Sequence, residues 1–177
     1  MSEKGLVHIY TGDGKGKTTA AVGLAVRAHG QGMNVCMVQF LKCKDSGELE
    51  TIKKLGGGFE LLRSKGIDKF VSQMDDKEKE QCKRETIALF NKATGILADK
   101  DIDLLILDEV FGAIRSGMLD VCAVRDFLNS KPDMLEIAMT GRDAPEELVE
   151  IADYVMDIQS VKHPFDRGIA ARRGIEY

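Results

Sequence analysis

The sequence predicts an α/β fold with a doubly wound, largely parallel sheet that is flanked by helices on both faces. Two observations predict it. Short apolar segments alternate with longer segments of helical character along the chain, which is the order expected of strands joined by crossover helices. Most of the apolar segments also lack the polar–apolar alternation of a half-exposed strand, and this is typical of strands that are covered on both faces.

The composition indicates an ordinary globular protein. The chain has 177 residues, of which 44% are hydrophobic and 31% charged, and we expect one domain over residues 1–177. A formal net charge of −4 gives no indication of a nucleic-acid surface. No apolar run approaches the roughly 20 residues that span a bilayer, and residues 1–4 form no signal peptide. We therefore expect a cytoplasmic protein that binds neither nucleic acid nor a membrane.

The cysteines and histidines predict neither a disulfide framework nor a metal centre. Cys36, Cys43, Cys82 and Cys122 are widely spaced and include no C-x-x-C pair, and the three histidines do not form a metal-ligand cluster. We expect free thiols in a reducing compartment, with Cys36 and Cys122 in the core.

The first half of the chain is expected to form three strands and two helices. Residues 6–10 are an apolar strand, and residues 17–30 are an alanine-rich helix that ends at glycine. Residues 34–41 are almost continuously apolar, which predicts a strand buried on both faces. The polar residues 42–55 are expected to form a loop that leads into a short helix, and residues 59–62 form a short strand after three consecutive glycines.

The second half begins with an expected loop at residues 64–74 and the longest helix at residues 75–98. Residues at helical spacing predict the buried face of that helix: Ile87, Phe90, Ala93 or Thr94, and Leu97. Apolar segments and the stretches between them predict the remaining elements: strands at 102–108, 135–139 and 154–156, and helices at 120–129 and 144–151.

The segment at residues 11–19 organises the rest of the chain. It reads Thr-Gly-Asp-Gly-Lys-Gly-Lys-Thr-Thr and stands between the first strand and the first helix. This context indicates a phosphate-binding loop (Walker A), whose backbone N–H groups and helix N-terminus suit a polyphosphate. Lys17 can reach the outer phosphates, and the Thr18 hydroxyl is placed to bind Mg²⁺. The residues expected around the nucleotide are Gly12, Asp13, Gly14, Lys15, Gly16, Lys17, Thr18 and Thr19.

The loop departs from the common pattern at its first position, where Thr11 stands in place of glycine. The alternative interpretation is a surface turn rich in glycine and lysine that precedes an ordinary helix. The flanking strand and helix favour the nucleotide site, and with it a P-loop NTPase-like form of the doubly wound fold.

An acidic pair follows the predicted strand at residues 102–108. Asp108 ends the strand and Glu109 comes directly after it, a Walker-B-like arrangement that can hold Mg²⁺ opposite Thr18. The alternative is an acidic helix start behind a strand. A phosphate loop in the same chain favours the metal-binding interpretation.

Two arginines are candidates for contacts with the phosphates. Arg142 lies in a Thr-Gly-Arg turn at another strand end, where a guanidinium could bind phosphate oxygens or could be a solvated loop arginine. Arg27 in the first helix is a further candidate, with a surface salt bridge as its alternative. Ligands of doubly wound sheets lie beyond the carboxyl ends of the strands, so Gly12, Asp108 and Arg142 can converge on one site.

The sequence supplies no arrangement typical of a protein nucleophile. We find neither a Ser/His/Asp nor a Cys/His set, and His163 in the tail is expected to be structural. The protein is therefore not expected to supply the nucleophile.

Segments along nearly the whole chain resemble ATP:cob(I)alamin (corrinoid) adenosyltransferases of the phosphate-loop type. The resemblance is carried by residues 11–19, 38–42, 47–48, 105–109, 140–145, 161–166, 168–169 and 173–177. The phosphate loop without its first glycine is the form that this family has. The tail, residues 161–166, 168–169 and 173–177, is the most specific piece, because generic nucleoside triphosphatases have no reason to carry it.

The resemblance implies a reaction and its partners. The family transfers the 5′-deoxyadenosyl group of ATP to the cobalt of a reduced corrinoid, cob(I)alamin or a precursor such as cob(I)yrinic acid a,c-diamide, and releases tripolyphosphate. Cobalt(I) attacks the ribose C5′, so catalysis rests on positioning and charge stabilisation. The resemblance also implies Mg²⁺, a reducing flavoprotein as electron donor, and a homodimer.

The resemblance implies roles for individual residues as well. Lys17 neutralises the triphosphate, and Thr18 and Glu109 hold Mg²⁺ with Asp108 behind them. The implied catalytic residues are Lys17, Thr18 and Glu109. Arg142, and less directly Arg27, match arginines near the phosphates.

The resemblance implies fewer residues for binding of the corrinoid than for binding of ATP. Relatives can place an aromatic pair that includes Trp after the third strand, to displace the lower ligand of cobalt. This chain has no Trp, and Phe70 is the aromatic residue of that loop. Some relatives also have a longer segment ahead of the first strand, where this sequence has residues 1–4.

Two alternatives stay open at this point. A conventional phosphate-loop ATPase or kinase would release ADP, although neither a water-positioning residue nor an acceptor site is identifiable. A non-catalytic regulator that binds nucleotide and corrinoid would explain the short N-terminal segment and the missing Trp.

Overall fold

The fold is a parallel sheet with helices on both faces, as the sequence predicts. The computed structural model describes residues 4–42, 47–64 and 69–175. Six strands pair in parallel in the order β3-β2-β4-β5-β1-β6. They are β1 (Val7–Thr11), β2 (Val35–Gln39), β3 (Phe59–Arg63), β4 (Leu104–Asp108), β5 (Glu136–Thr140) and β6 (Tyr154–Asp157).

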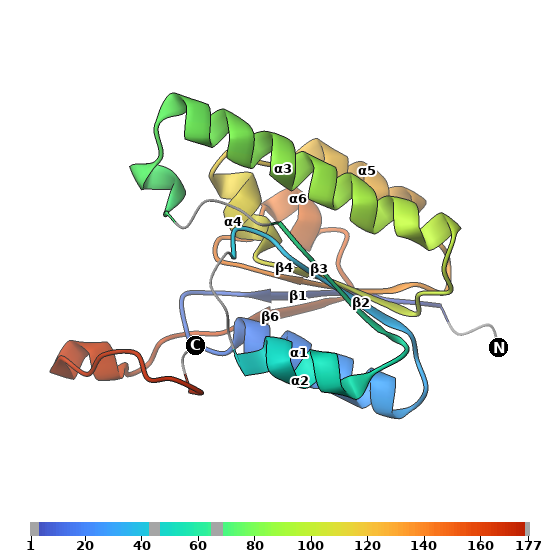
Figure 1. Ribbon diagram of the computed structural model, residues 1–177, viewed down its shortest axis with the longest axis horizontal. Helices are drawn as coiled ribbons and strands as arrows, with labels where there is room; N and C mark the ends of the chain where they lie inside the picture. The colour runs from blue at the N-terminus through green and yellow to red at the C-terminus, as the bar shows by residue number, and fades with distance from the viewer. Residues whose placement is uncertain (1–3, 43–46, 65–68, 176–177) are drawn as a thin grey trace.

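The helices form two layers. Figure 1 shows α1 and α2 on one face of the sheet and α3, α4, α5 and α6 on the other. Their bounds are α1 (Lys17–Gly30), α2 (Gly47–Leu55), α3 (Asp76–Gly95), α4 (Val110–Arg115), α5 (Val121–Ser130) and α6 (Glu146–Val149). Three short 3₁₀ helices complete the described chain: η1 (Val71–Gln73), η2 (Ile96–Ala98) and η3 (Pro164–Arg167). None of the helices in this part of the chain combines the length and apolar character that a membrane crossing needs.

The core lies on both sides of the sheet, which explains the continuous apolar strands. Every residue of β2 and β4 is buried. Along β4, Leu105 and Leu107 pack in the cluster beneath α3 and α5, whereas Leu104 and Ile106 pack in the cluster beneath α1. Successive side chains point to opposite faces of a strand, so a strand covered twice has no polar face.

Several local expectations need correction. The long helix ends at Gly95, and η2 replaces its last turn. Ile87 is 39% exposed, because the buried stripe of α3 runs through Cys82, Thr86, Leu89, Phe90 and Ala93. The predicted helix at 144–151 is reduced to the four residues of α6. The sequence analysis also missed α4, which begins directly after Glu109.

The cysteine expectations have a mixed outcome. Cys36 is buried in β2, as predicted. The prediction for Cys122 is wrong: this residue is exposed at the start of α5, because α5 turns Val124 and Leu128 toward the core instead. Cys43 lies outside the described residues.

The strand order brings the predicted site residues to one edge. β1, β4 and β5 are neighbours or near neighbours in the sheet, and their carboxyl ends lead into the glycine-rich loop, Glu109 and Gly141 respectively. In the register of β2 and β4, Gln39 lies beside Asp108. This carboxyl edge is where doubly wound sheets place their ligands.

Candidate functional site

The glycine-rich loop between β1 and α1 is held against the chain that follows β6. Gly14 donates its N–H to the Ile158 carbonyl at 2.7 Å, and Ile158 donates to the Thr11 carbonyl at 2.9 Å. Gly12 has φ +98°, and a Cβ at this position would stand 2.4 Å from both Asp157 Oδ1 and the Ile158 carbonyl oxygen. The loop therefore needs glycine at position 12 for its own backbone shape and for this close approach.

Thr11 explains the missing first glycine. It is the last residue of β1 and pairs with Asp157 of β6, so this position belongs to the strand and has no need of a left-handed conformation. Its hydroxyl oxygen accepts the N–H of Ala144 at 3.2 Å and so connects the loop to the segment after β5.

Lys17 turns back into the concavity of the loop. Its side chain is buried, and Nζ donates to the carbonyl oxygens of Gly12 at 2.6 Å and Gly14 at 2.7 Å. Burial lowers the pKa of this lysine, and the nearby Arg142 lowers it further, whereas Glu109 and Asp13 act in the opposite direction. The two carbonyl oxygens solvate the Lys17 ammonium but carry no net charge. An anion bound beside Lys17 would therefore stabilise the charged form of this side chain strongly.

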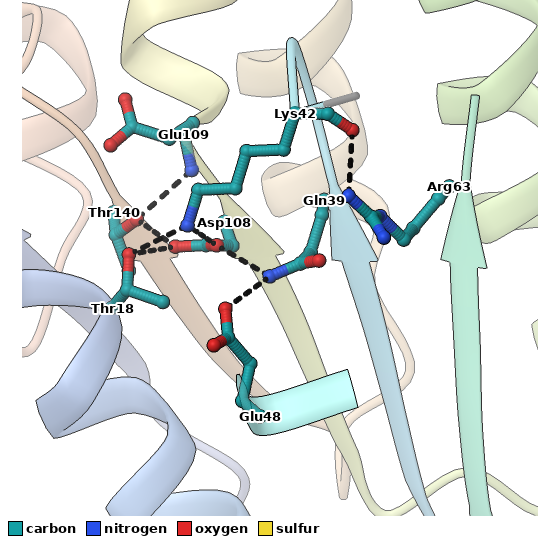
Figure 2. Close-up of polar contacts among 8 residues, drawn as sticks. All are labelled: Thr18, Gln39, Lys42, Glu48, Arg63, Asp108, Glu109 and Thr140. Carbon is teal, nitrogen blue, oxygen red and sulfur yellow. Dashed lines mark hydrogen bonds and ion pairs between the residues drawn. The ribbon is translucent and has the colours of Figure 1, made fainter. Parts of the chain in front are cut away.

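Asp108 is the centre of the polar network at the carboxyl edge (Figure 2). The residue is fully buried, and each of its carboxylate oxygens accepts two hydrogen bonds. Oδ1 accepts from the hydroxyls of Thr18 at 2.9 Å and Thr140 at 2.7 Å. Oδ2 accepts from Gln39 Nε2 at 3.2 Å and from Lys42 Nζ at 2.7 Å. The first helix, three strands and the loop after β2 therefore meet at one carboxylate.

The Glu109 side chain points in a different direction from that of Asp108. Its φ of +62° is left-handed, a rare conformation for a residue with a side chain, and such strain concentrates at functional sites. The Glu109 N–H donates to the Thr140 hydroxyl at 2.9 Å, while the carboxylate points away from the Asp108 network (Figure 2). Its charge is among those that raise the pKa of Lys17.

Arg142 lies beside the glycine-rich loop, as expected. Its Nη2 donates to the Asp13 carbonyl at 3.5 Å, and its charge acts on Lys17. The preceding Gly141, with φ +146°, allows β5 to end against α4, because a Cβ there would stand 2.7 Å from the Phe111 Cβ.

The remaining predicted residues lie further from the network. Asp13, Lys15 and Thr19 are exposed around the loop, and Asp13 Oδ1 accepts the Ser160 N–H at 3.3 Å. Arg27 is exposed ten residues beyond Lys17 on α1, about 15 Å further along the helix axis. Phe70 is 78% exposed ahead of η1.

His163 has the structural role that its place in the tail suggested. Its Nδ1 accepts the N–H of Phe165 at 3.2 Å and caps η3.

The sequence analysis gave no role to three residues that the fold brings into the network: Gln39, Lys42 and Glu48. Gln39 Nε2 joins Asp108 to Glu48, whose Oε1 it meets at 3.3 Å, and Gln39 Oε1 is buried without a hydrogen-bond partner in the described part of the chain. A signal was present, since Gln39 is the single polar residue of a continuously apolar strand. Such a residue is costly to bury unless it serves a polar site.

The arrangement can hold a polyphosphate and a hard cation. Lys17 and Arg142 supply positive charge at the loop, and the hydroxyl of Thr18 meets the carboxylate of Asp108. Hydroxyl and carboxylate oxygens are the donors that Mg²⁺ prefers. The Thr18 hydroxyl and the Asp108 carboxylate already contact one cation, the Lys42 ammonium. Its Nζ lies 3.0 Å from Thr18 Oγ1 and 2.7 Å from Asp108 Oδ2. The residues present therefore fit a cation at this position.

Comparison with known proteins identifies the family to which the chain is similar. The family described as ATP:corrinoid adenosyltransferase BtuR/CobO/CobP matches residues 3–177. A corrinoid adenosyltransferase of Sinorhizobium sp is 37% identical over 177 residues, which cover 99% of this chain and 81% of that protein. Corrinoid adenosyltransferase CobA of Salmonella typhimurium is 34% identical over 178 residues, covering 100% of this chain and 88% of that protein.

A further relative and one solved structure are also similar to the chain. A corrinoid adenosyltransferase of Pseudomonas aeruginosa is 34% identical over 176 residues, which cover 99% of this chain and 85% of that protein. Among solved structures, EssC (ATPases 2 and 3) from Geobacillus thermodenitrificans superposes with a TM-score of 0.44 and 16% identity, covering 98% of this chain and 36% of that chain.

Proposed function

Because the chain belongs to the ATP:corrinoid adenosyltransferase family, we propose that it transfers the 5′-deoxyadenosyl group of ATP to the cobalt of a reduced corrinoid and releases tripolyphosphate. The observation that carries the proposal at the level of the site is the buried Lys17 inside the glycine-rich loop, next to a Thr18 hydroxyl that meets Asp108. The reaction makes a cobalt–carbon bond to C5′ and breaks the bond between C5′ and the α-phosphate oxygen. The electron pair of cobalt(I) forms the new bond, and tripolyphosphate leaves with the pair of the old one.

The residues at the carboxyl edge suit the charge that this step moves. The leaving group keeps all three phosphates and gains charge as the bond breaks, so positive groups fixed at the phosphates lower the barrier. Lys17 is held inside the loop and Arg142 at its rim by hydrogen bonds to the loop carbonyls of Gly12 and Asp13. The glycine-rich backbone from Gly12 to Thr19 would hold the triphosphate through its N–H groups.

We propose Mg²⁺ as the cation of this site. Thr18 and Asp108 would hold it, with Glu109 as a further ligand from the loop side of the network. The ion supplies charge neutralisation at the phosphates. Gln39 and Thr140 would keep the Asp108 carboxylate oriented, since both are fully buried and donate to it.

The nucleophile belongs to the second substrate in this proposal. The chain therefore has to position C5′ toward a corrinoid and exclude water, and no protein group has to attack. Phe70 is a candidate for the corrinoid side, because it exposes an aromatic ring in the segment after β3. We further propose a reducing flavoprotein as the electron donor for cobalt, a homodimer as the assembly, and the cytoplasm as the location.

The proposal is tested by incubating the protein with ATP, Mg²⁺ and chemically reduced cobalamin. We expect the corrinoid absorption spectrum to change to that of a light-sensitive cobalt–carbon product. Hydrolysis of ATP with an unaltered corrinoid would identify a conventional ATPase instead. Binding of both ligands without any product would identify the non-catalytic regulator.

A further inference from the structure

The Lys42 ammonium occupies the position between Thr18 and Asp108. Its Nζ is 2.7 Å from Asp108 Oδ2 and 3.0 Å from Thr18 Oγ1 (Figure 2). These are two of the three side chains to which the proposed function assigns Mg²⁺. A monovalent cation built into the chain therefore stands where the divalent cation has to bind.

Of the four described side chains that donate to Asp108, Lys42 is the one suited to leave. The Gln39 and Thr140 side chains are fully buried within the sheet, and Thr18 belongs to α1. The Lys42 side chain is 28% exposed and has four rotatable bonds, so it can move into solvent without a change in the sheet. Its departure would remove the ion-pair partner that Asp108 has in the described part of the chain, which is costly unless another cation takes its place.

The backbone beside Lys42 holds the side chain toward the network. Leu41 has φ +55°, a left-handed conformation at the point where the chain leaves β2. The Lys42 carbonyl accepts a hydrogen bond from Arg63 Nη2 at 3.0 Å, which connects this turn to the end of β3. Strained residues of this kind are found where a side chain has to be aimed.

We propose that Lys42 is the built-in counter-ion of Asp108 in the ligand-free protein and yields this place when Mg²⁺ and ATP bind together. Within residues 4–42, 47–64 and 69–175, Lys42 is the basic side chain that pairs with Asp108. A divalent ion at the same place, with Lys17, Lys42 and Arg142 nearby, leaves an excess of positive charge that a bound triphosphate would offset. Lys42 is thus a positioning residue that couples cation binding to nucleotide binding. This inference rests on the proposed Mg²⁺·ATP site but requires nothing of the corrinoid reaction.

The test measures Mn²⁺ binding by electron paramagnetic resonance, with and without ATP and in the absence of corrinoid. In the wild-type protein we expect weak binding that ATP strengthens greatly. In K42M we expect Mn²⁺ without ATP to bind about tenfold more tightly than in the wild type, because the competing charge is gone. With ATP present the two proteins should differ by less than about threefold, since Lys42 has already left.

Three further variants keep the test decisive. Lys100→Met is the matched control, because Lys100 also pairs with a carboxylate, that of Glu60, at the opposite edge of the sheet. It should bind Mn²⁺ as the wild type does. The double variant K42M/D108N should lose the tightening, and K42Q replaces K42M if the latter does not fold.

Three results would overturn the inference. They are unchanged or weaker Mn²⁺ binding in the Lys42 variant, an equal tightening in Lys100→Met, and a tightening that persists in the double variant. None of these results depends on whether the protein modifies a corrinoid, so the failure of this inference and that of the proposed function are distinguishable.

Discussion

Thr18 donates its hydroxyl hydrogen to Asp108 across 2.9 Å, although ninety positions separate the two residues in the chain. The contact joins the first turn of α1 to the end of β4. It fixes the start of the helix that follows the glycine-rich loop relative to a fully buried strand of the sheet. The loop and the acidic strand end therefore act as one site.

Lys17→Ala should lower kcat/KM for ATP by about 100-fold or more, because the variant lacks the positive charge that faces the phosphates. The corrinoid spectrum at varied ATP concentration measures the effect. Circular dichroism should show an unchanged fold, since the lysine makes its described hydrogen bonds only to two loop carbonyls. Near-normal turnover would remove Lys17 from the mechanism.

Asp108→Asn and Glu109→Gln should separate the two acidic candidates for Mg²⁺. We expect Glu109→Gln to raise the Mg²⁺ concentration required for half-maximal activity by about tenfold with little effect on stability. Asp108→Asn should raise it too and should also destabilise the fold, because the buried network loses its charge. An unchanged Mg²⁺ titration in Glu109→Gln would assign the ion to Asp108 without its neighbour.

Gly14→Ala should destabilise the protein by about 1–3 kcal/mol through overpacking. A Cβ at position 14 would stand 2.6 Å from the Ile158 carbonyl oxygen, and the atoms around it belong to backbone that cannot rotate away. Gly23→Ala is the matched control, since a Cβ there meets nothing within 4 Å on α1. It should stabilise the protein by up to about 1 kcal/mol. Urea unfolding measures both, and equal effects would contradict the packing of the loop against residue 158.

Cys36 should give the unfolding free energy a dependence on alkaline pH. Burial raises the pKa of its thiol from 9.0 to about 12. Between these values the unfolded chain releases the proton and the folded chain keeps it, so the contribution is complete below pH 9 and is lost as pH rises toward 12. The advantage of the wild type over Cys36→Ala should therefore fall by about 1.4 kcal/mol per pH unit above pH 9. A constant difference would contradict the burial of this thiol.

The sequence predicted the strands and the loop well because their signals are local. Continuous apolar runs identify β2 and β4, and the glycines and Lys17 identify the turn between β1 and α1. Ile87 and Cys122 were misplaced because both helices are only partly covered, and small rotations about the helix axis decide which residues face the sheet.

The network around Asp108 was not predictable in the same way. Gln39 meets Asp108 because β2 pairs with β4 in one particular register, and strand order is a property of the whole sheet. Lys42 reaches the site because Leu41 has a left-handed backbone conformation, which a leucine in the sequence does not predict. Only the structure shows which side chains such long-range strand pairing brings together.

The most direct test of the account is the count of phosphate products by phosphorus NMR for each corrinoid that becomes modified. Attack at C5′ predicts one tripolyphosphate per cobalt–carbon bond formed, with no ADP. The result that would contradict the account is ADP and orthophosphate accumulating while the corrinoid stays unmodified.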